Sequence, residues 1–131
     1  MSKKQPVTPQ AWTYNAKYLG GHAAFAKDAV GILYLYPGPD FKVVFESKTV
    51  NIQIPLSSVT DSKIVTEKEL SAARVFLVGI LAFAWKKKNR MLLVEFKDNL
   101  GSTQTPVFEP QKVDEVASKL YEMRQQLKMK S

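Results

Sequence analysis

Residues 110–130 read PQKVDEVASKLYEMRQQLKMK, and this segment decides the fold. Its apolar residues recur at steps of three and four, which places them on one stripe of an α-helix. The stripe consists of Val113, Val116, Ala117, Leu120, Met123 and Leu127. Pro110 suits the first helical position, and acids early in the segment with lysines at its end match the helix dipole. Such a stripe needs a partner surface, which the preceding residues must supply.

Short apolar runs separated by turn residues precede this helix and predict β-strands. The clearest is VNIQI at 50–54, where apolar and polar residues alternate as in a strand with one face on the core. Further strands are predicted over 14–25, 30–36, 41–46, 62–66, 91–97 and 103–108. Gly20 and Gly21 predict a bulge or a close backbone approach in the first strand, and Pro106 predicts an edge position or a bulge in the last. The pairs 30–36 with 41–46 and 91–97 with 103–108 form predicted hairpins.

Six or seven short strands followed by one amphipathic helix have a natural packing solution. The strands form a strongly bent antiparallel sheet or barrel, and the helix lies across its open end and completes the core. We therefore expect an α+β fold with a C-terminal helical cap. At 131 residues the chain is one domain, with residues 1–11 as a flexible leader and 12–131 as the folded unit.

Residues 74–90, RVFLVGILAFAWKKKNR, hold the longest apolar run. Its eleven residues from 75 to 85 would span about 16 Å as a helix, roughly half of a hydrocarbon core of about 30 Å, so they do not cross a bilayer. As one strand they would extend about 36 Å, longer than a common strand. Thr66 and Glu69 have the spacing of a capping box, which favours an extra helix over 67–84, with a hairpin or a loop as the alternatives.

Two interpretations of this run remain open. In the first it is a buried element of the core, because periodicity cannot separate a buried helix from a buried strand here. In the second it faces a membrane, with its aromatic residues at the headgroup level and its cations on anionic lipid, worth about 1 kcal/mol per basic residue. The candidate binding residues are Arg74, Phe83, Trp85, Lys86, Lys87, Lys88 and Arg90.

Composition limits the compartment and the chemistry. There is no cysteine, so disulfides, thiolate nucleophiles and cysteine metal sites are excluded. The basic start has no apolar stretch after it, which is unlike a secretory signal, and a cytoplasmic location is expected. The net charge of +7 predicts attraction to polyanions.

No residue pattern predicts catalysis, a cofactor or a metal site. His22 is the only histidine and is expected to be structural or exposed. The acidic pairs Glu67 with Glu69 and Asp114 with Glu115 are interpreted as solvated or helix-start charges. Aromatic residues that could stack nucleic-acid bases are expected to lie in the core. They are Trp12, Tyr34 and Tyr36. The chain is therefore predicted not to be an enzyme.

The order of elements, together with IPLSSVTDSKIV at 54–65, resembles the pleckstrin-homology-like (PH-like) superfold, especially its prokaryotic GRAM-like members. The run at 74–88 is similar to one in small prokaryotic proteins of that group. The resemblance covers about residues 14–127. It implies a seven-stranded barrel capped by a helix, and a family that binds lipid headgroups, peptides or proteins. Phosphoinositide-binding members carry a basic cluster at the first hairpin, where this chain offers only His22 and Lys27.

Three functions follow, in order of preference. The first is a non-enzymatic module that associates with an anionic membrane surface or a membrane-bound partner through 74–90, at the inner face of the membrane. The second is a protein-interaction or self-association module, which would include a homo-oligomer, in which the same apolar segment lies against another chain. The third is nucleic-acid binding, which rests on charge alone.

Overall fold

Eight strands form one antiparallel sheet in the part of the chain that the structure describes. This structure is a computed structural model, and it describes residues 11–66, 69 and 90–130. The strands are β1 (Trp12–Gly20), β2 (Ala29–Tyr36), β3 (Lys42–Glu46), β4 (Asn51–Pro55), β5 (Val59–Thr66), β6 (Arg90–Lys97), β7 (Thr103–Gln104) and β8 (Val107–Pro110). A short 3-10 turn, η1 (Leu56–Ser58), joins β4 to β5, and α3 (Val113–Lys130) ends the chain.

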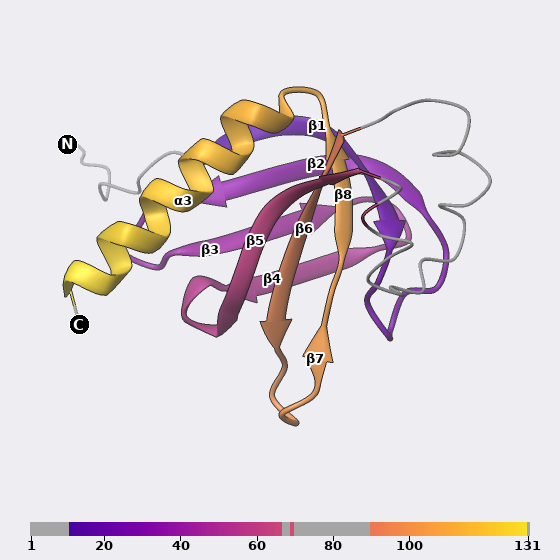
Figure 1. The fold of residues 1–131 in the computed structure, drawn as a ribbon. Helices are drawn as coiled ribbons and strands as arrows, with labels where there is room; N and C mark the ends of the chain where they lie inside the picture. The colour runs from indigo at the N-terminus through magenta and orange to yellow at the C-terminus, as the bar shows by residue number, and fades with distance from the viewer. Residues whose placement is uncertain (1–10, 67–68, 70–89, 131) are drawn as a thin grey trace, which may run out of the picture.

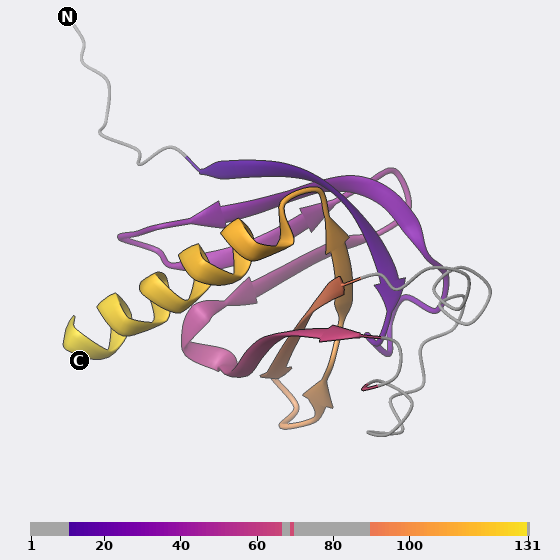
Figure 2. The same ribbon diagram turned by 45° about the horizontal axis from the view of Figure 1, so that its top comes forward.

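Seven of these strands follow one path, β4-β3-β2-β1-β8-β6-β5, and the short β7 pairs with β6 beside it. The sheet curls into a half-barrel, and α3 runs along its open side (Figures 1 and 2). The predicted α+β class, the bent sheet of about seven strands and the C-terminal helix are confirmed, and the arrangement is consistent with a PH-like fold. The extra helix predicted over 67–84, apart from Glu69, and the leader predicted over 1–11, apart from Ala11, lie outside the described residues.

The main core fills the space between the inner face of the sheet and α3. The predicted helical stripe lies there: Val116, Leu120 and Met123 are completely or almost completely buried, and its other three members pack against the same core. On β4, Ile52 and Ile54 point inward while Asn51 and Gln53 are exposed, as the alternation predicted. The spacing of apolar residues in α3 and in β4 therefore predicted correctly which side of each element faces the core.

A second, smaller cluster lies on the opposite face of the sheet. Leu92 and Val94 of β6 belong to the main core, whereas the intervening Leu93 points the other way, because side chains alternate along a strand. We call this second set the outer cluster. It consists of Leu19, Val65, Met91, Leu93 and Val107.

Several predicted boundaries were wrong. The first strand ends at Gly20 and not at 25, because Gly20 and Gly21 have φ values of 124° and 102°, which turn the chain away. The predicted bulge there is confirmed by a shift in the pairing register with β8 between Tyr18 and Gly20. Pro110 is the last residue of β8, paired with Ala16, and does not begin the helix.

Pro106 divides the last predicted strand into β7 and β8. The resulting β8 is not an edge strand, since it lies between β1 and β6. Pro106 has no N–H to donate, yet its carbonyl still accepts a hydrogen bond from the Val94 amide at 3.1 Å. The pairing register with β6 is the same on both sides of Pro106, since Gln104 pairs with Phe96 and Val107 with Leu93, so neither predicted alternative, an edge position or a bulge, is observed for β8.

The aromatic residues expected in the core are distributed differently. Trp12 packs against the main core. Tyr34 and Tyr36 are half-buried and alternate with the buried Leu33 and Leu35, so they lie on the outer face of β2. Their rings stack on each other, with centroids 6.1 Å apart. The core assignment was therefore wrong for these two tyrosines.

Candidate functional site

The predicted binding residues come from the connection between β5 and β6. Thr66, the last residue of β5, pairs with Arg90, the first residue of β6, so this connection leaves and re-enters the sheet at one place. Six of the predicted residues lie outside the described part of the chain: Arg74, Phe83, Trp85, Lys86, Lys87 and Lys88. Arg90 is the one whose position the structure gives.

Arg90 forms a two-pronged ion pair with Asp114 in the first turn of α3. Its Nη1 donates to Oδ2 at 2.9 Å and its Nη2 to Oδ1 at 2.7 Å. Both side chains remain more than half exposed. The hydrogen bonds from Arg90 to Asp114 raise the pKa of the guanidinium further above its ordinary value. The Arg90 side chain therefore links the start of β6 to the first turn of α3. Its charge is less available to an external ligand than that of a lysine without an acidic partner.

Positive charge is concentrated outside the described residues. Seven of the 19 basic residues but only one of the 12 acidic residues fall in 1–10, 67–68, 70–89 and 131. Those segments consequently carry six of the seven net positive charges, and the sheet with its helix is almost neutral. Any strong attraction to a polyanion must arise mainly from these segments.

The predicted capping box at the entrance to the connection is formed. The Thr66 amide donates to Glu69 Oε1 at 2.8 Å, and the Glu69 amide donates in return to Thr66 Oγ1 at 3.3 Å. These reciprocal bonds satisfy two backbone donors that would otherwise lack partners at a helix start. Glu69 thus has a local structural role, as its spacing from Thr66 predicted.

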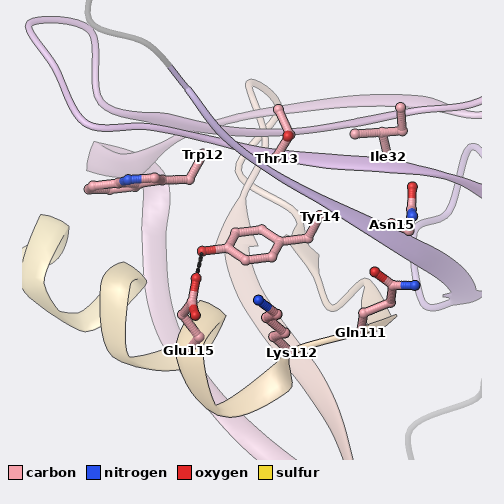
Figure 3. A pocket seen from close by; sticks show the side chains of 8 residues that line it. All are labelled: Trp12, Thr13, Tyr14, Asn15, Ile32, Gln111, Lys112 and Glu115. Carbon is pink, nitrogen blue, oxygen red and sulfur yellow. Dashed lines mark hydrogen bonds between the residues drawn. The ribbon is translucent and has the colours of Figure 1, made fainter.

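A cavity of about 330 Å³ lies where β1 meets the beginning of α3 (Figure 3). It is lined by Trp12, Thr13, Tyr14, Asn15, Ile32, Gln111, Lys112 and Glu115. On the α3 side, the Lys119 Nζ lies 4.2 Å from the centroid of the Trp12 ring, within the range of a cation–π contact. One face of the Trp12 ring is therefore already covered by a cation of the same chain.

Tyr14 and Glu115 face each other at this cavity, as Figure 3 shows. The Tyr14 hydroxyl donates a 2.7 Å hydrogen bond to Glu115 Oε2. Burial, and next this hydrogen bond, raise the pKa of Tyr14 far above its ordinary value. The phenol is therefore held protonated as a hydrogen-bond donor, which does not suit a nucleophile or a general base.

Two further hollows adjoin the far end of α3, and both are lined by Ser57 and Leu127. The larger, about 460 Å³, continues over the β2–β3 turn, and the smaller, about 320 Å³, continues toward Arg124. Arg124 is held there by a 3.2 Å hydrogen bond from its Nη1 to Ser62 Oγ. The larger hollow is lined by Asp40 and Lys42 as well as Ser57, and no hydrogen bond or ion pair is observed among these three side chains in the described part of the chain.

His22 has a structural role, as expected. Its Nδ1 accepts a 3.1 Å hydrogen bond from the Ala24 amide, which requires a neutral ring nitrogen. Its ring lies near those of Phe25 and Phe96, with centroids 5.4 and 5.8 Å away. Burial lowers the pKa of His22, while the nearby Asp98 opposes this shift.

Metal and membrane-spanning features are absent from the described residues. No group of three or more His, Asp or Glu side chains among them could hold a metal ion. None of the helices formed by these residues combines the length and apolarity needed to cross a bilayer.

The cavity with Tyr14 and Glu115 was missed by the sequence reasoning. These residues are 101 positions apart, and neither occurs in a local pattern that signals a hydrogen bond. The Arg90 pairing was missed for the same reason, although Arg90 itself had been selected for its charge. No protein-family model, curated protein or solved structure matches the chain.

Proposed function

We propose that this chain is a non-enzymatic, PH-like binding module that associates peripherally with anionic membrane surfaces through residues 74–90. The observation that carries the proposal is the charge distribution: an almost neutral folded unit is joined to a connection with three consecutive lysines. Support for the PH-like relationship comes from the strand path and the terminal helix. The expected setting is the cytoplasmic side of a membrane.

The lysines at 86–88 supply most of the attraction. Each basic residue near an anionic surface contributes about 1 kcal/mol, so three in sequence give about 3 kcal/mol, enough for weak reversible binding. Arg90 contributes less, because Asp114 already neutralises it. Recognition of one particular headgroup is not expected, since this mode depends on charge density and is screened by salt.

Vesicle sedimentation tests the proposal. The chain should pellet with vesicles of phosphatidylcholine containing phosphatidylserine, should remain in the supernatant with phosphatidylcholine alone, and should be released by salt. The variant Lys86→Glu, Lys87→Glu, Lys88→Glu should lose this binding. Binding that ignores both the lipid charge and this triple substitution would reject the proposal.

Self-association is a second candidate, favoured by one surface feature. Val30 and Ile32 project from the outer face of β2 with 74% and 38% of their surface exposed, in line with the half-buried Tyr34 and Tyr36. Rows of exposed apolar side chains often mark interaction surfaces. Light scattering across a range of protein concentrations tests this candidate. A dimer that dissociates in Val30→Lys, Ile32→Lys would support it, and a monomer at all concentrations would remove it.

A further inference from the structure

The strand β4 forms one edge of the sheet, and one side of its backbone has no partner among the described residues. The strand path begins at β4, which pairs with β3 alone of the described strands. Just after β4, the Leu56 amide donates to the Phe41 carbonyl at 3.0 Å, so the even-numbered residues of this segment direct their backbone groups toward β3. Because these groups alternate along an antiparallel strand, the N–H and C=O groups of Asn51 and Gln53 point away from the sheet.

The two edges of the sheet differ in their protection. At the other end of the path, β5 carries Asp61 and Lys63, whose charged groups lie 3.7 Å apart, and Ser62 accepts a hydrogen bond from Arg124 of α3. The edge strand β4 contains no charged residue. Proteins usually block an open edge with charges, prolines or a covering element, because its unpaired groups are a template for another strand. Pro55 restricts only the end of β4, so the rest of this edge can accept a further strand.

The larger hollow at the far end of α3 adjoins this edge. Its volume is about 460 Å³, and Gln53 and Pro55 of β4 form part of its lining. Leu127 of α3 and Pro39 and Phe41 of the β2–β3 turn add apolar walls. The other lining residues are Asp40, Lys42 and Ser57. Strand addition takes its affinity from main-chain hydrogen bonds and its specificity from pockets for alternate side chains, and β4 with this hollow offers both.

A second copy of the chain would leave the hollow without an apolar occupant. If β4 paired with β4 of a copy in antiparallel fashion, the copy would bring Ser47, Thr49 or Asn51 opposite Pro55, depending on the register. All three side chains are small and polar. Asp40 and Lys42 carry opposite charges, so the hollow does not favour a charged occupant of either sign. The occupant that fits is therefore an extended segment with a large apolar side chain.

We propose that the β4 edge accepts an extended segment of another protein as an added antiparallel strand, with a large apolar side chain of that segment in the hollow beside Pro55. Asn51 and Gln53 exchange main-chain hydrogen bonds with the added strand. The residue two positions along the segment from the one opposite Gln53 reaches the hollow, because side chains on one face of a strand recur every second residue. This inference does not rest on the lipid proposal, since no residue of 74–90 takes part in it.

Titration of the ¹⁵N-labelled full chain with a synthetic peptide tests the proposal. The probe is a peptide with blocked ends in which leucine and threonine alternate, with one lysine at each end for solubility. A second peptide carries serine in place of every leucine. The amide signals of Asn51 and Gln53 should shift when the leucine peptide is added. The serine peptide should bind about 10-fold or more weakly, because it has no apolar side chain to fill the hollow.

Hydrogen exchange of the natural chain provides a measurement without substitution. In the free chain at low protein concentration, the amides of Asn51 and Gln53 should exchange rapidly, while those of Ile52 and Ile54, which face β3, exchange slowly. The leucine peptide should slow the exchange of the first pair by about 10-fold or more. Slow exchange of that pair in the free chain would mean that the edge is already covered. Slowing that follows protein concentration without peptide would mean that a second copy occupies the edge. Either outcome would overturn the inference.

Two substitutions at one position separate the backbone from the side chain. Gln53→Pro removes the outward N–H and places a ring in the path of the peptide, and an edge strand tolerates proline where the N–H faces away from the sheet. Gln53→Ala is the matched control, because it removes the side chain but keeps the N–H. The proline variant should lose about 10-fold or more in affinity for the leucine peptide, and the alanine variant about threefold or less.

Equal peptide affinities of the two variants would contradict strand addition at β4. So would the absence of any shift at Asn51 and Gln53 in the natural chain with about 1 mM leucine peptide, since even weak strand addition is detectable there. If Gln53→Pro does not fold, the hydrogen exchange of the natural chain decides alone.

Discussion

Tyr14 and Glu115 join the first strand to the terminal helix by one hydrogen bond, 2.7 Å from the phenol oxygen to Oε2. They lie 101 residues apart, so this bond ties the first described strand to the last element. Hydrogen bonds to charged acceptors are stronger than neutral ones, and this one lies at the start of α3, where the stripe enters the core. It therefore helps to fix how far along the sheet the helix is placed.

Replacing Tyr14 by Phe should lower the free energy of unfolding at pH 7 by about 1 to 2 kcal/mol, because the buried ring remains but the bond is lost. Tyr121→Phe, on α3, is the matched control, since Tyr121 is 62% exposed and its substitution should change the free energy of unfolding little. Urea denaturation of the three proteins measures the difference. Equal stabilities for the two variants would contradict the role given to this bond.

The same pair predicts a dependence on alkaline pH. The folded chain raises the pKa of Tyr14 above its ordinary 10.0, so the contribution to stability is complete below pH 10 and is lost as the pH rises above it. Burial raises the pKa of Tyr18 as well, so the natural protein should weaken for both reasons. Tyr14→Phe should show a shallower loss between pH 9 and 11 by urea denaturation. Parallel curves would show that Tyr14 is not a source of this dependence.

His22 predicts a loss of stability in mild acid. Since burial lowers the pKa of His22, the contribution to stability is present above its ordinary 6.5 and falls as the pH drops below that value. His22→Asn keeps an acceptor for the Ala24 amide but does not titrate. Thermal unfolding at pH 7.5 and 5 should show a smaller decrease for this variant than for the natural protein. An equal decrease would place the acid sensitivity elsewhere.

Gly31 predicts a steric effect within β2. A Cβ there would overlap the backbone carbonyl of Glu46 on β3 and would lie 2.9 Å from the Ser47 Cβ. Because backbone atoms cannot swing aside, Gly31→Ala should cost about 2 to 3 kcal/mol by forcing the strands apart. Gly101→Ala, which meets nothing within 4 Å but has a φ of +83°, should cost about 1 kcal/mol from backbone strain alone. Urea denaturation should show the larger loss of unfolding free energy for Gly31→Ala. A larger loss for Gly101→Ala would show that the close approach at Gly31 is unimportant.

The fold was largely predictable because its signals are local. The period of the α3 stripe and the alternation on β4 each predict which side of the element faces the core, and both predictions are confirmed. Boundaries were less predictable. The first strand was extended to 25 because apolar residues continue past Gly20, and only the positive φ values of the two glycines end it. Pro110 fits a helix start in sequence, but its pairing with Ala16 across the sheet keeps it in a strand.

The candidate site was less predictable because it depends on contacts between distant residues. Arg90 follows the lysines in sequence and was grouped with them, yet Asp114, 24 residues later, is its partner. The outer cluster was also not anticipated. Leu93 lies in the strand predicted over 91–97, but only the register of β5, β6 and β8 brings it together with Val65 and Val107.

The Arg90 pairing predicts a separation between stability and lipid binding. Arg90→Gln should weaken the folded chain, because it leaves Asp114 without its partner, while reducing the affinity for phosphatidylserine vesicles less than Lys87→Gln does. Both substitutions remove one charge, so each controls for the other. Thermal unfolding and vesicle titration should therefore rank the two variants in opposite orders, and the same order in both would contradict this division.

The most direct measurement compares two variants with the same net charge in vesicle sedimentation. One carries Lys86→Glu, Lys87→Glu, Lys88→Glu, and the other carries Lys17→Glu, Lys48→Glu, Lys97→Glu at exposed positions of the folded unit. At three lysines of about 1 kcal/mol each, the first should lose about 100-fold or more in affinity for anionic vesicles, and the second should lose much less. Equal losses would show that net charge alone directs binding, and would contradict the assignment of the site to residues 74–90.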